Sequence, residues 1–328
     1  MKKNYFLLAA STMMFAACAQ TDMVNEVVTE EAPQAIGFET FANKQTRAEI
    51  NSKTDLEKEG EQFTVWAWKS QTGVDTPTQI FGDKTSTAGQ IVEYTTSGWT
   101  YSPTQYWDKT GTYDFYAVAP KAGDGVIYSI DKSSKNITIS GVESGPATSA
   151  TDYLLDRNGV TQRSGANNTD KVEFNFEHIM SKITIIVKQQ SLLNNNKFVT
   201  LTDLTMKNWN DNEGTFQQNA TSEWTIDEGT GGSYTFLTDG NVNLSTQYTA
   251  GSYLMVPQNV GDLEFVISFK IGDDETFLKH EGKIENVKWE TNTHYIYTIS
   301  VGPKPIEFSV KTVESWGNGT DSGSTTIE

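Results

Sequence analysis

The amino-acid sequence predicts an all-β protein with two β-sandwich domains, and three observations lead to this fold class. Apolar and polar residues alternate in many short runs, which is typical of strands that bury one face of an antiparallel sheet. The composition, with 16 Phe, 13 Tyr, 8 Trp and 26 Gly, favours strands joined by tight turns. No ten-residue segment carries a convincing helical stripe of apolar residues, and 175–182 comes nearest to one.

The length and the charge limit the possible classes of protein. A chain of 328 residues is long enough for about two domains. The formal net charge of −17 argues against binding to nucleic acid, because an acidic surface repels phosphates. We interpret the charge as a solvated acidic surface, with an acidic cation-binding site as the alternative. Because Cys18 is the only cysteine, no internal disulfide can form and the fold depends on its cores.

The N-terminus has the features of an export signal. Two lysines precede a mostly apolar stretch, 5–15, and two alanines then stand directly before Cys18. The stretch is too short to cross a bilayer as a helix. Its end resembles the bacterial lipobox, although Phe15 stands where Leu is usual. We therefore expect 1–17 to be a lipoprotein signal peptide and Cys18 to be lipidated; an ordinary secretory signal is the alternative.

The first strand is expected soon after this signal. Residues 19–32 are polar and acidic without periodicity, which predicts a flexible tether. The following run, 35–41, alternates and is expected to form a strand with Ile36 and Phe38 on one face. The next stretch, 42–60, is again polar.

Further strands are expected in two groups separated by a polar run, 159–170, which we expect to be unstructured and to contain the domain boundary. The first group is 62–68, 112–118 and a hairpin formed by 126–130 and 136–139. The second group is 171–176, 181–188, 263–271, 295–301 and 306–313. The core of the second sandwich is expected to include Phe174, Ile183, Ile185, Phe265 and Ile267.

The last of these runs, 306–313, has two interpretations. It can be the last strand of the second sandwich, which leaves only 317–328 as a short tail rich in Gly, Ser and Thr. It can also be a donor strand for a neighbouring molecule, because its apolar residues alternate suitably.

Residues that could carry chemistry do not form a recognisable site. His178, His280 and His294 lack metal-ligand spacing, and we expect no metal and no cofactor. No nucleophile elbow, phosphate-binding loop or dinucleotide fingerprint is present, and no carboxylate pair stands out. We therefore expect no catalytic residue and no enzyme activity. Residues 210–214 contain oxygen ligands of the calcium type without the full loop spacing, which favours a solvated turn.

Several tryptophans could form a platform for stacking sugars. Aromatic residues in a small sandwich belong more often to the core, and we favour that interpretation. The tryptophans concerned are Trp66, Trp68, Trp99 and Trp107.

A set of short motifs, in a fixed order, covers nearly the whole mature chain. The motifs are the lipobox at Cys18; Ile36-Gly37-Phe38 and Thr46-Arg47-Ala48; Tyr106-Trp107 and Tyr113-Asp114-Phe115-Tyr116-Ala117; Asp152-Tyr153-Leu154-Leu155; Phe174-x-Phe176-x-His178-x-Met180-Ser181-Lys182; Tyr253-Leu254-Met255-Val256-Pro257-Gln258; and Trp289-x-x-Asn292-x-x-Tyr295-x-Tyr297. This ordered set resembles the fimbrillin family of Bacteroidetes, the type V pilins and their accessory subunits.

The resemblance implies a domain organisation. It implies two transthyretin-like β-sandwiches, over 48–165 and 166–328. It also implies that 18–47 is a lipidated propeptide that contains the first strand. An arginine-specific, trypsin-like protease is expected to remove this piece by cutting between Arg47 and Ala48.

The resemblance also implies a function. After cleavage a neighbour's strand is expected to replace the strand with Ile36 and Phe38, so that the chain acts as a structural or accessory pilin subunit of an adhesive fimbria. It is then expected on the surface of the outer membrane, held at first by the lipid anchor on Cys18, with other pilin subunits as partners and a host or bacterial surface as ligand. The alternative is a tip adhesin or glycan-binding lipoprotein that stays anchored and is not polymerised.

The lipobox gives the first testable prediction. Replacing Cys18→Ser removes the thiol that would carry the lipid, so we expect incorporation of labelled fatty acid to be abolished and maturation to be blocked. Metabolic labelling with a fatty-acid analogue measures this, and unchanged labelling of the variant contradicts the prediction.

Overall fold

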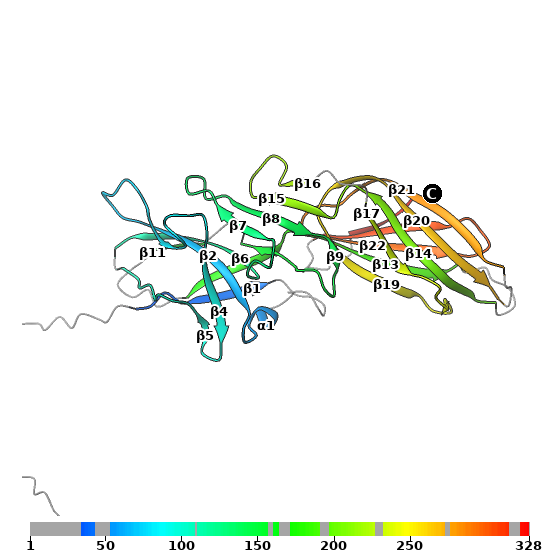
Figure 1. Cartoon of the computed structure of the whole chain (residues 1–328), viewed down its shortest axis with the longest axis horizontal. Coiled ribbons are helices and arrows are strands. Elements are labelled where there is room, and N and C mark those ends of the chain that lie inside the picture. The colour runs from blue at the N-terminus through cyan, green and yellow to red at the C-terminus, as the bar shows by residue number, and fades with distance from the viewer. Residues whose placement is uncertain are drawn as a thin grey trace, which may run out of the picture. The chain divides into compact units, whose positions relative to one another are not determined.

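The computed structural model describes residues 34–42, 53–108, 110–156, 160–163, 171–190, 197–226, 232–272, 276–314 and 322–327. Within these ranges the chain forms strands β1 to β24 and a single four-residue helix, α1 (Lys53–Leu56), which confirms the all-β prediction (Figure 1). None of the helical structure described could span a membrane. The predicted sites at Cys18, Arg47 and Ala48 lie outside the described residues.

A nine-stranded sheet holds the first strand of the chain. Its order is β1-β12-β10-β6-β2-β4-β5, with β11 also paired to β6 and β3 to β2. Its strands are β1 (Phe38–Ala42), β2 (Gln62–Ser70), β3 (Thr78–Phe81), β4 (Gln90–Thr95), β5 (Gly98–Thr100), β6 (Thr112–Ala119), β10 (Leu154–Leu155), β11 (Val160–Arg163) and β12 (Val172–His178). The chain just before β1 bridges the segment after β5, through Ala35 and Tyr106, so the sheet curls around one core.

The opposite face of this sheet packs on a four-stranded sheet, which gives β2 a core on each side. The four strands are β7 (Ile127–Ile130), β8 (Ile137–Glu143), β15 (Glu213–Gln217) and β16 (Trp224–Ile226). Strands β7 and β8 form the predicted hairpin. Trp66 and Trp68 pack with the four-stranded sheet, while Trp99 and Trp107 belong to or line the core on the other face. These four tryptophans therefore do not form a sugar platform.

Two further sheets share a third core. The six-stranded sheet contains β9 (Gly145–Pro146), β13 (Ser181–Gln189), β19 (Tyr248–Met255), β22 (Thr293–Val301), β23 (Glu307–Glu314) and β24 (Ser322–Ile327). The five-stranded sheet contains β14 (Val199–Trp209), β17 (Gly232–Leu237), β18 (Val242–Asn243), β20 (Asn259–Ile271) and β21 (Leu278–Lys288). Ile183 and Ile185 from one sheet meet Phe265 and Ile267 from the other, as the alternation predicted.

One residue, Phe174, lies in a different core from the one that the sequence predicts. We expected Phe174 in the second core, but β12 lies beside β1 and Phe174 packs against Phe38 and Phe63 in the first core. The alternation of residues 172–176 specifies which face of the strand is buried, but it contains no information about the neighbouring strand.

Three expectations about local structure also need correction. Val160–Arg163, within the run expected to be unstructured, forms β11 on β6. Two strand pairs, β1–β12 and β13–β22, are parallel rather than antiparallel. Part of the expected tail forms a strand, because β24 pairs with β23; β23 also pairs with β22, which agrees with the interpretation of 306–313 as a strand of the chain's own sheet.

Two segments pair across residues 165 and 166, where the two-domain division was expected. Strand β9 joins β19, and β15 joins β8. The division into two transthyretin-like domains therefore stays a prediction, while the sharing of strands between the two halves of the chain is an observation.

The second prediction tests the placement of Phe174. Phe174→Ala leaves a cavity beside Phe38 and is expected to lower the free energy of unfolding by about 3–5 kcal/mol. Glu173→Ala, on the exposed face of the same strand, should change it by less than about 0.5 kcal/mol. Denaturant titration of both variants measures the difference, and equal losses contradict the placement.

Candidate functional site

The candidate site is β1 together with the part of the core that it fills. Ile36, Phe38 and Thr40 alternate toward the interior and are 1%, 2% and 0% exposed. The residues between them, Gly37 and Glu39, are only partly buried. The structure thus places Ile36 and Phe38 on the same inward face, as the sequence predicted.

The ring of Phe38 is the centre of this packing. It contacts five aromatic rings, most of them edge to face, which is the arrangement that aromatic quadrupoles favour. The ring centroids lie 5.4 Å (Phe81), 5.5 Å (Tyr101), 5.7 Å (Phe63), 5.8 Å (Phe174) and 6.2 Å (Phe115) from that of Phe38. Burying Ile36 and Phe38 stabilises the closed core by about 1.5–3 kcal/mol for each side chain.

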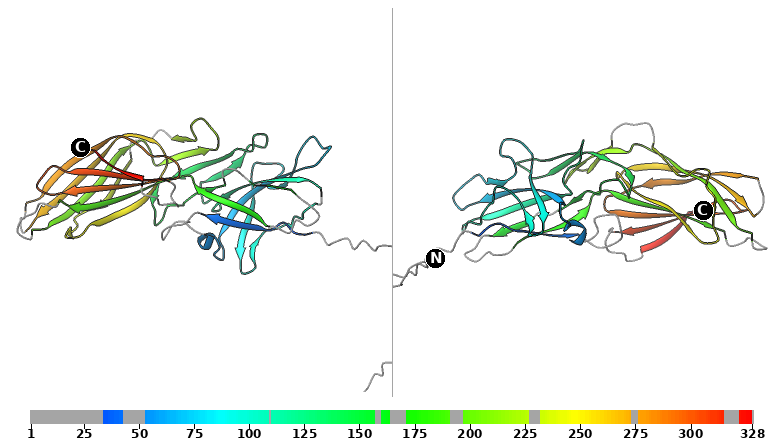
Figure 2. Two further views of the ribbon diagram at one scale, coloured as in Figure 1. Left: turned by 180° about the vertical axis from the view of Figure 1, so that it is seen from behind. Right: turned by 60° about the horizontal axis from the view of Figure 1, so that its bottom comes forward.

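Backbone hydrogen bonds fix β1 along one edge. Residues 38–42 run parallel to residues 172–176 of β12, and Figure 2 shows the blue β1 beside the green β12. The Val172 amide donates to the Gly37 carbonyl at 2.8 Å. Within the described residues, residues 38–42 pair with β12 alone, so β1 is an edge strand.

The chain just before β1 is held on its other side as well. The Ile36 amide donates to the Gln105 carbonyl at 2.9 Å, and the Trp107 amide donates to the Gln34 carbonyl at 2.9 Å. The hydroxyl of Tyr101 donates to the Ile36 carbonyl at 2.7 Å. Sequence reasoning missed Tyr101 and Gln105, and the only signal nearby was the Tyr106-Trp107 motif.

One ion pair connects β1 to the helix that follows it in the chain. Glu39 forms a salt bridge with Lys53 at the start of α1. The hydrogen bond from Lys53 holds the pKa of Glu39 below its ordinary value, and Glu39 raises the pKa of Lys53 in turn. Both groups are partly exposed, so this pair contributes much less than the buried rings.

The histidines have structural partners rather than metal-binding neighbours. His178 Nδ1 lies 2.9 Å from Asp152 Oδ1, and His280 stacks on Phe269. Burial, together with the charge of Lys182, lowers the pKa of His294 to about 4. The described residues contain no group of three or more His, Cys, Asp or Glu that could hold a metal ion.

The predicted turn at 210–214 is held by hydrogen bonds within the protein. Asn212 Oδ1 accepts a bond from Trp209 Nε1 at 2.9 Å, and Asn210 Nδ2 donates to the Asn259 carbonyl at 2.9 Å. The side-chain amides of Asn210 and Asn212 thus hold the turn in place within the protein.

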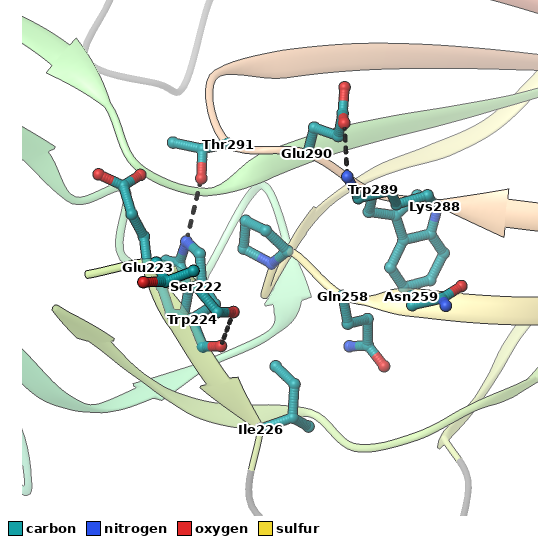
Figure 3. Close-up of a pocket in the computed structure, with 12 residues that line it drawn as sticks. Ser222, Glu223, Trp224, Ile226, Gln258, Asn259, Lys288, Trp289, Glu290 and Thr291 are labelled. Carbon is teal, nitrogen blue, oxygen red and sulfur yellow. Dashed lines mark hydrogen bonds and ion pairs between the residues drawn. The ribbon is translucent and has the colours of Figure 1, made fainter. Parts of the chain in front are cut away.

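A separate pocket of about 490 Å³ could also bind a ligand. Figure 3 shows Trp224 and Trp289 on facing sides of it. Both rings are buried, at 9% and 1% exposure. Their indole N–H groups already donate to Thr291 Oγ1 at 3.1 Å and to the Tyr297 hydroxyl at 3.0 Å. The pocket thus lacks an open aromatic face for stacking a sugar.

Comparisons with known proteins agree with this architecture. A fimbrial protein from Bacteroides vulgatus superposes with a TM-score of 0.57 at 16% identity, over 86% of this chain and 99% of that chain. A proposed cell adhesion protein from Bacteroides uniformis gives a TM-score of 0.50 at 16% identity, over the same shares. These likenesses show a common fold. Comparison with curated protein sequences gives no significant match.

The family follows from the sequence itself. A family model described as fimbrillin-like matches residues 46–316, which is most of the chain. The protein therefore belongs to the fimbrillin-like family, as the ordered motifs indicated.

The third prediction concerns the ion pair of β1. Because folding lowers the pKa of Glu39, its contribution to stability is present above the ordinary pKa near 4.5 and is lost as the pH falls through the lower folded-state pKa. Glu39→Gln should cost less than about 1 kcal/mol at pH 7, and the difference from the wild type should vanish in acid.

Thermal unfolding of both proteins across this pH range measures the effect. Glu173→Gln is the matched control, because Glu173 faces Glu39 in the register of β12 and its removal relieves a like charge. If Glu39→Gln and the wild type differ by the same amount at every pH, the ion pair is not the cause.

Proposed function

We propose that this chain is a structural or accessory subunit of a type V-like fimbria that serves adhesion. In this proposal the subunits assemble on the outer membrane surface by protease-triggered strand exchange. Membership of the fimbrillin-like family supports the fimbrial role. One observation supports the mechanism. Strand β1 with Phe38 precedes Arg47 in the chain, whereas the strand and the rings that it packs against all follow Arg47.

A cut between Arg47 and Ala48 changes what holds β1 in place. In the intact chain, ten residues, 43–52, join β1 to α1, and the strand stays near its groove whenever it comes loose. After the cut only the contacts of residues 34–42 and the Glu39–Lys53 ion pair retain it. Dissociation then becomes possible at low concentration of the fragment.

Loss of β1 uncovers a surface that another strand can fill. The edge of β12 loses its backbone partner, and Phe63, Phe115 and Phe174 lose the ring that packs between them. A strand from another subunit with alternating apolar residues restores both kinds of contact, which is strand addition. In this scheme the partners are other pilin subunits and an arginine-specific protease.

The same cut would separate the subunit from its membrane anchor. A lipid on Cys18 attaches residues 18–47 to the outer membrane, and these residues leave together with β1. An anchored adhesin or glycan-binding lipoprotein, the alternative function, keeps its lipid and does not need the cut.

The fourth prediction tests the cut directly. The chain contains three arginines, so Arg157→Lys and Arg163→Lys leave Arg47 as the only site for an arginine-specific protease. Treated with such a protease, this variant should give a new N-terminus at Ala48 by mass spectrometry and then form filaments visible by electron microscopy.

The matched control adds Arg47→Lys, which keeps the positive charge but removes the last protease site. It should remain monomeric under the same treatment. If it forms filaments as readily as the cleavable protein, cleavage-gated exchange is wrong for this chain and the anchored alternative is favoured.

A further inference from the structure

Thr40, the third inward residue after Ile36 and Phe38, is a polar side chain in an apolar core. Thr40 is 0% exposed, it lies on the same face as Ile36 and Phe38, and it stands beside Phe174 in the register of β12. Its hydroxyl oxygen has no hydrogen-bond partner among the described residues. A buried hydroxyl that loses its bonds to water without replacement opposes the association that buries it.

Other unsatisfied groups surround the same core. The indole Nε1 atoms of Trp99 and Trp107 are also buried without a partner among the described residues, and both rings pack in or against the core that contains Phe38. The inward face of β1 thus combines two well-packed apolar side chains with a polar one that the core does not satisfy.

We propose that Thr40 makes β1 a replaceable strand, and that the strand which takes its place carries a β-branched aliphatic residue at this position. This inference rests on the strand exchange proposed above. Valine has nearly the shape of threonine, so such a strand fills the same space without burying a hydroxyl. The occupant is then a partner strand with the inward pattern Ile-x-Phe-x-Val, running parallel to β12.

The chain contains two segments with a β-branched aliphatic residue at this position: Ile267-x-Phe269-x-Ile271, in an inner strand of the five-stranded sheet, and Ile306-x-Phe308-x-Val310. In the second segment the first two inward residues repeat those of Ile36-x-Phe38-x-Thr40, and valine stands in the place of threonine. Phe308 is buried against Phe265 with a centroid distance of 5.4 Å, so this pattern already packs as a strand against an aromatic core. In this structure the segment is paired with β22 and β24, so a copy that donates this strand must first release it from its own sheet.

The first test is the stability of the uncut chain. Thr40→Val should raise the denaturant concentration at the midpoint of unfolding. Thr202→Val is the matched control, because Thr202 is a buried threonine of β14 whose hydroxyl also lacks a partner among the described residues. Both substitutions should stabilise, but only Thr40→Val should slow the loss of β1 after cleavage. Equal rates of strand loss in the two variants would overturn the proposal.

The second test measures replacement by a peptide. The Arg157→Lys, Arg163→Lys chain is cut at Arg47, and the release of the labelled N-terminal fragment that ends at Arg47 is followed while peptides compete for the groove. The peptides are residues 34–42 with Thr40 and the same peptide with Thr40→Val. We expect the valine peptide to bind about tenfold more tightly, which corresponds to about 1.4 kcal/mol.

The outcomes separate this inference from the proposed function. If both peptides displace the strand with equal affinity, strand exchange stands and the role of Thr40 is wrong. If neither peptide displaces it, strand exchange itself fails and the inference fails with it. A peptide with the sequence of residues 306–310 and its flanks should compete like the valine peptide, and failure of this peptide alone overturns the Ile-x-Phe-x-Val pattern as the partner.

Discussion

The packing of the Phe38 ring is the interaction on which the first core depends. Its five aromatic neighbours come from β2, β3, β6, β12 and the segment after β5, so a single side chain joins most of the nine-stranded sheet. Because β1 is at the same time an edge strand, this core is closed by an element whose strand residues pair with one neighbour, β12. The packing of Phe38 therefore determines both how stable the core is and how much apolar surface its removal would uncover.

In the proposed exchange, β1 has to be retained first and released later, which requires opposing contributions to its binding. Burial of Ile36 and Phe38, together with hydrogen bonds to Gln105 and Val172, holds β1 in the intact chain. The partly exposed ion pair to Lys53 adds little to that retention, and the unsatisfied hydroxyl of Thr40 opposes it. In the proposed exchange, the covalent connection adds a high local concentration of the strand, and a cut at Arg47 would remove that contribution while leaving the contacts of the described residues in place.

The sequence predicted which face of a strand is buried better than it predicted which strands are neighbours. Alternation identified Ile36 and Phe38 as inward, and Ile183 with Phe265 as parts of one core, because the side-chain period of a strand is fixed by its backbone. Alternation could not place Phe174 beside Phe38, since the choice of neighbouring strand depends on contacts that are distant in the chain. Tyr101 was missed for the same reason, because its hydroxyl donates a hydrogen bond to the carbonyl of Ile36, which is distant in the sequence. The processing sites rest on residue order alone.

The remaining sheets explain why loss of β1 can stay local. On the opposite face of β2 and β6, Trp66 and Val118 pack with Phe216 of the four-stranded sheet, so these strands keep a complete core on one side. The third core is built only from Ile183 onward and contains no residue of β1. Removal of β1 therefore exposes one face of one sheet while the other two cores remain closed. This arrangement is what the proposed strand exchange requires, because a chain that has lost β1 would have to stay folded until a new strand fills the groove.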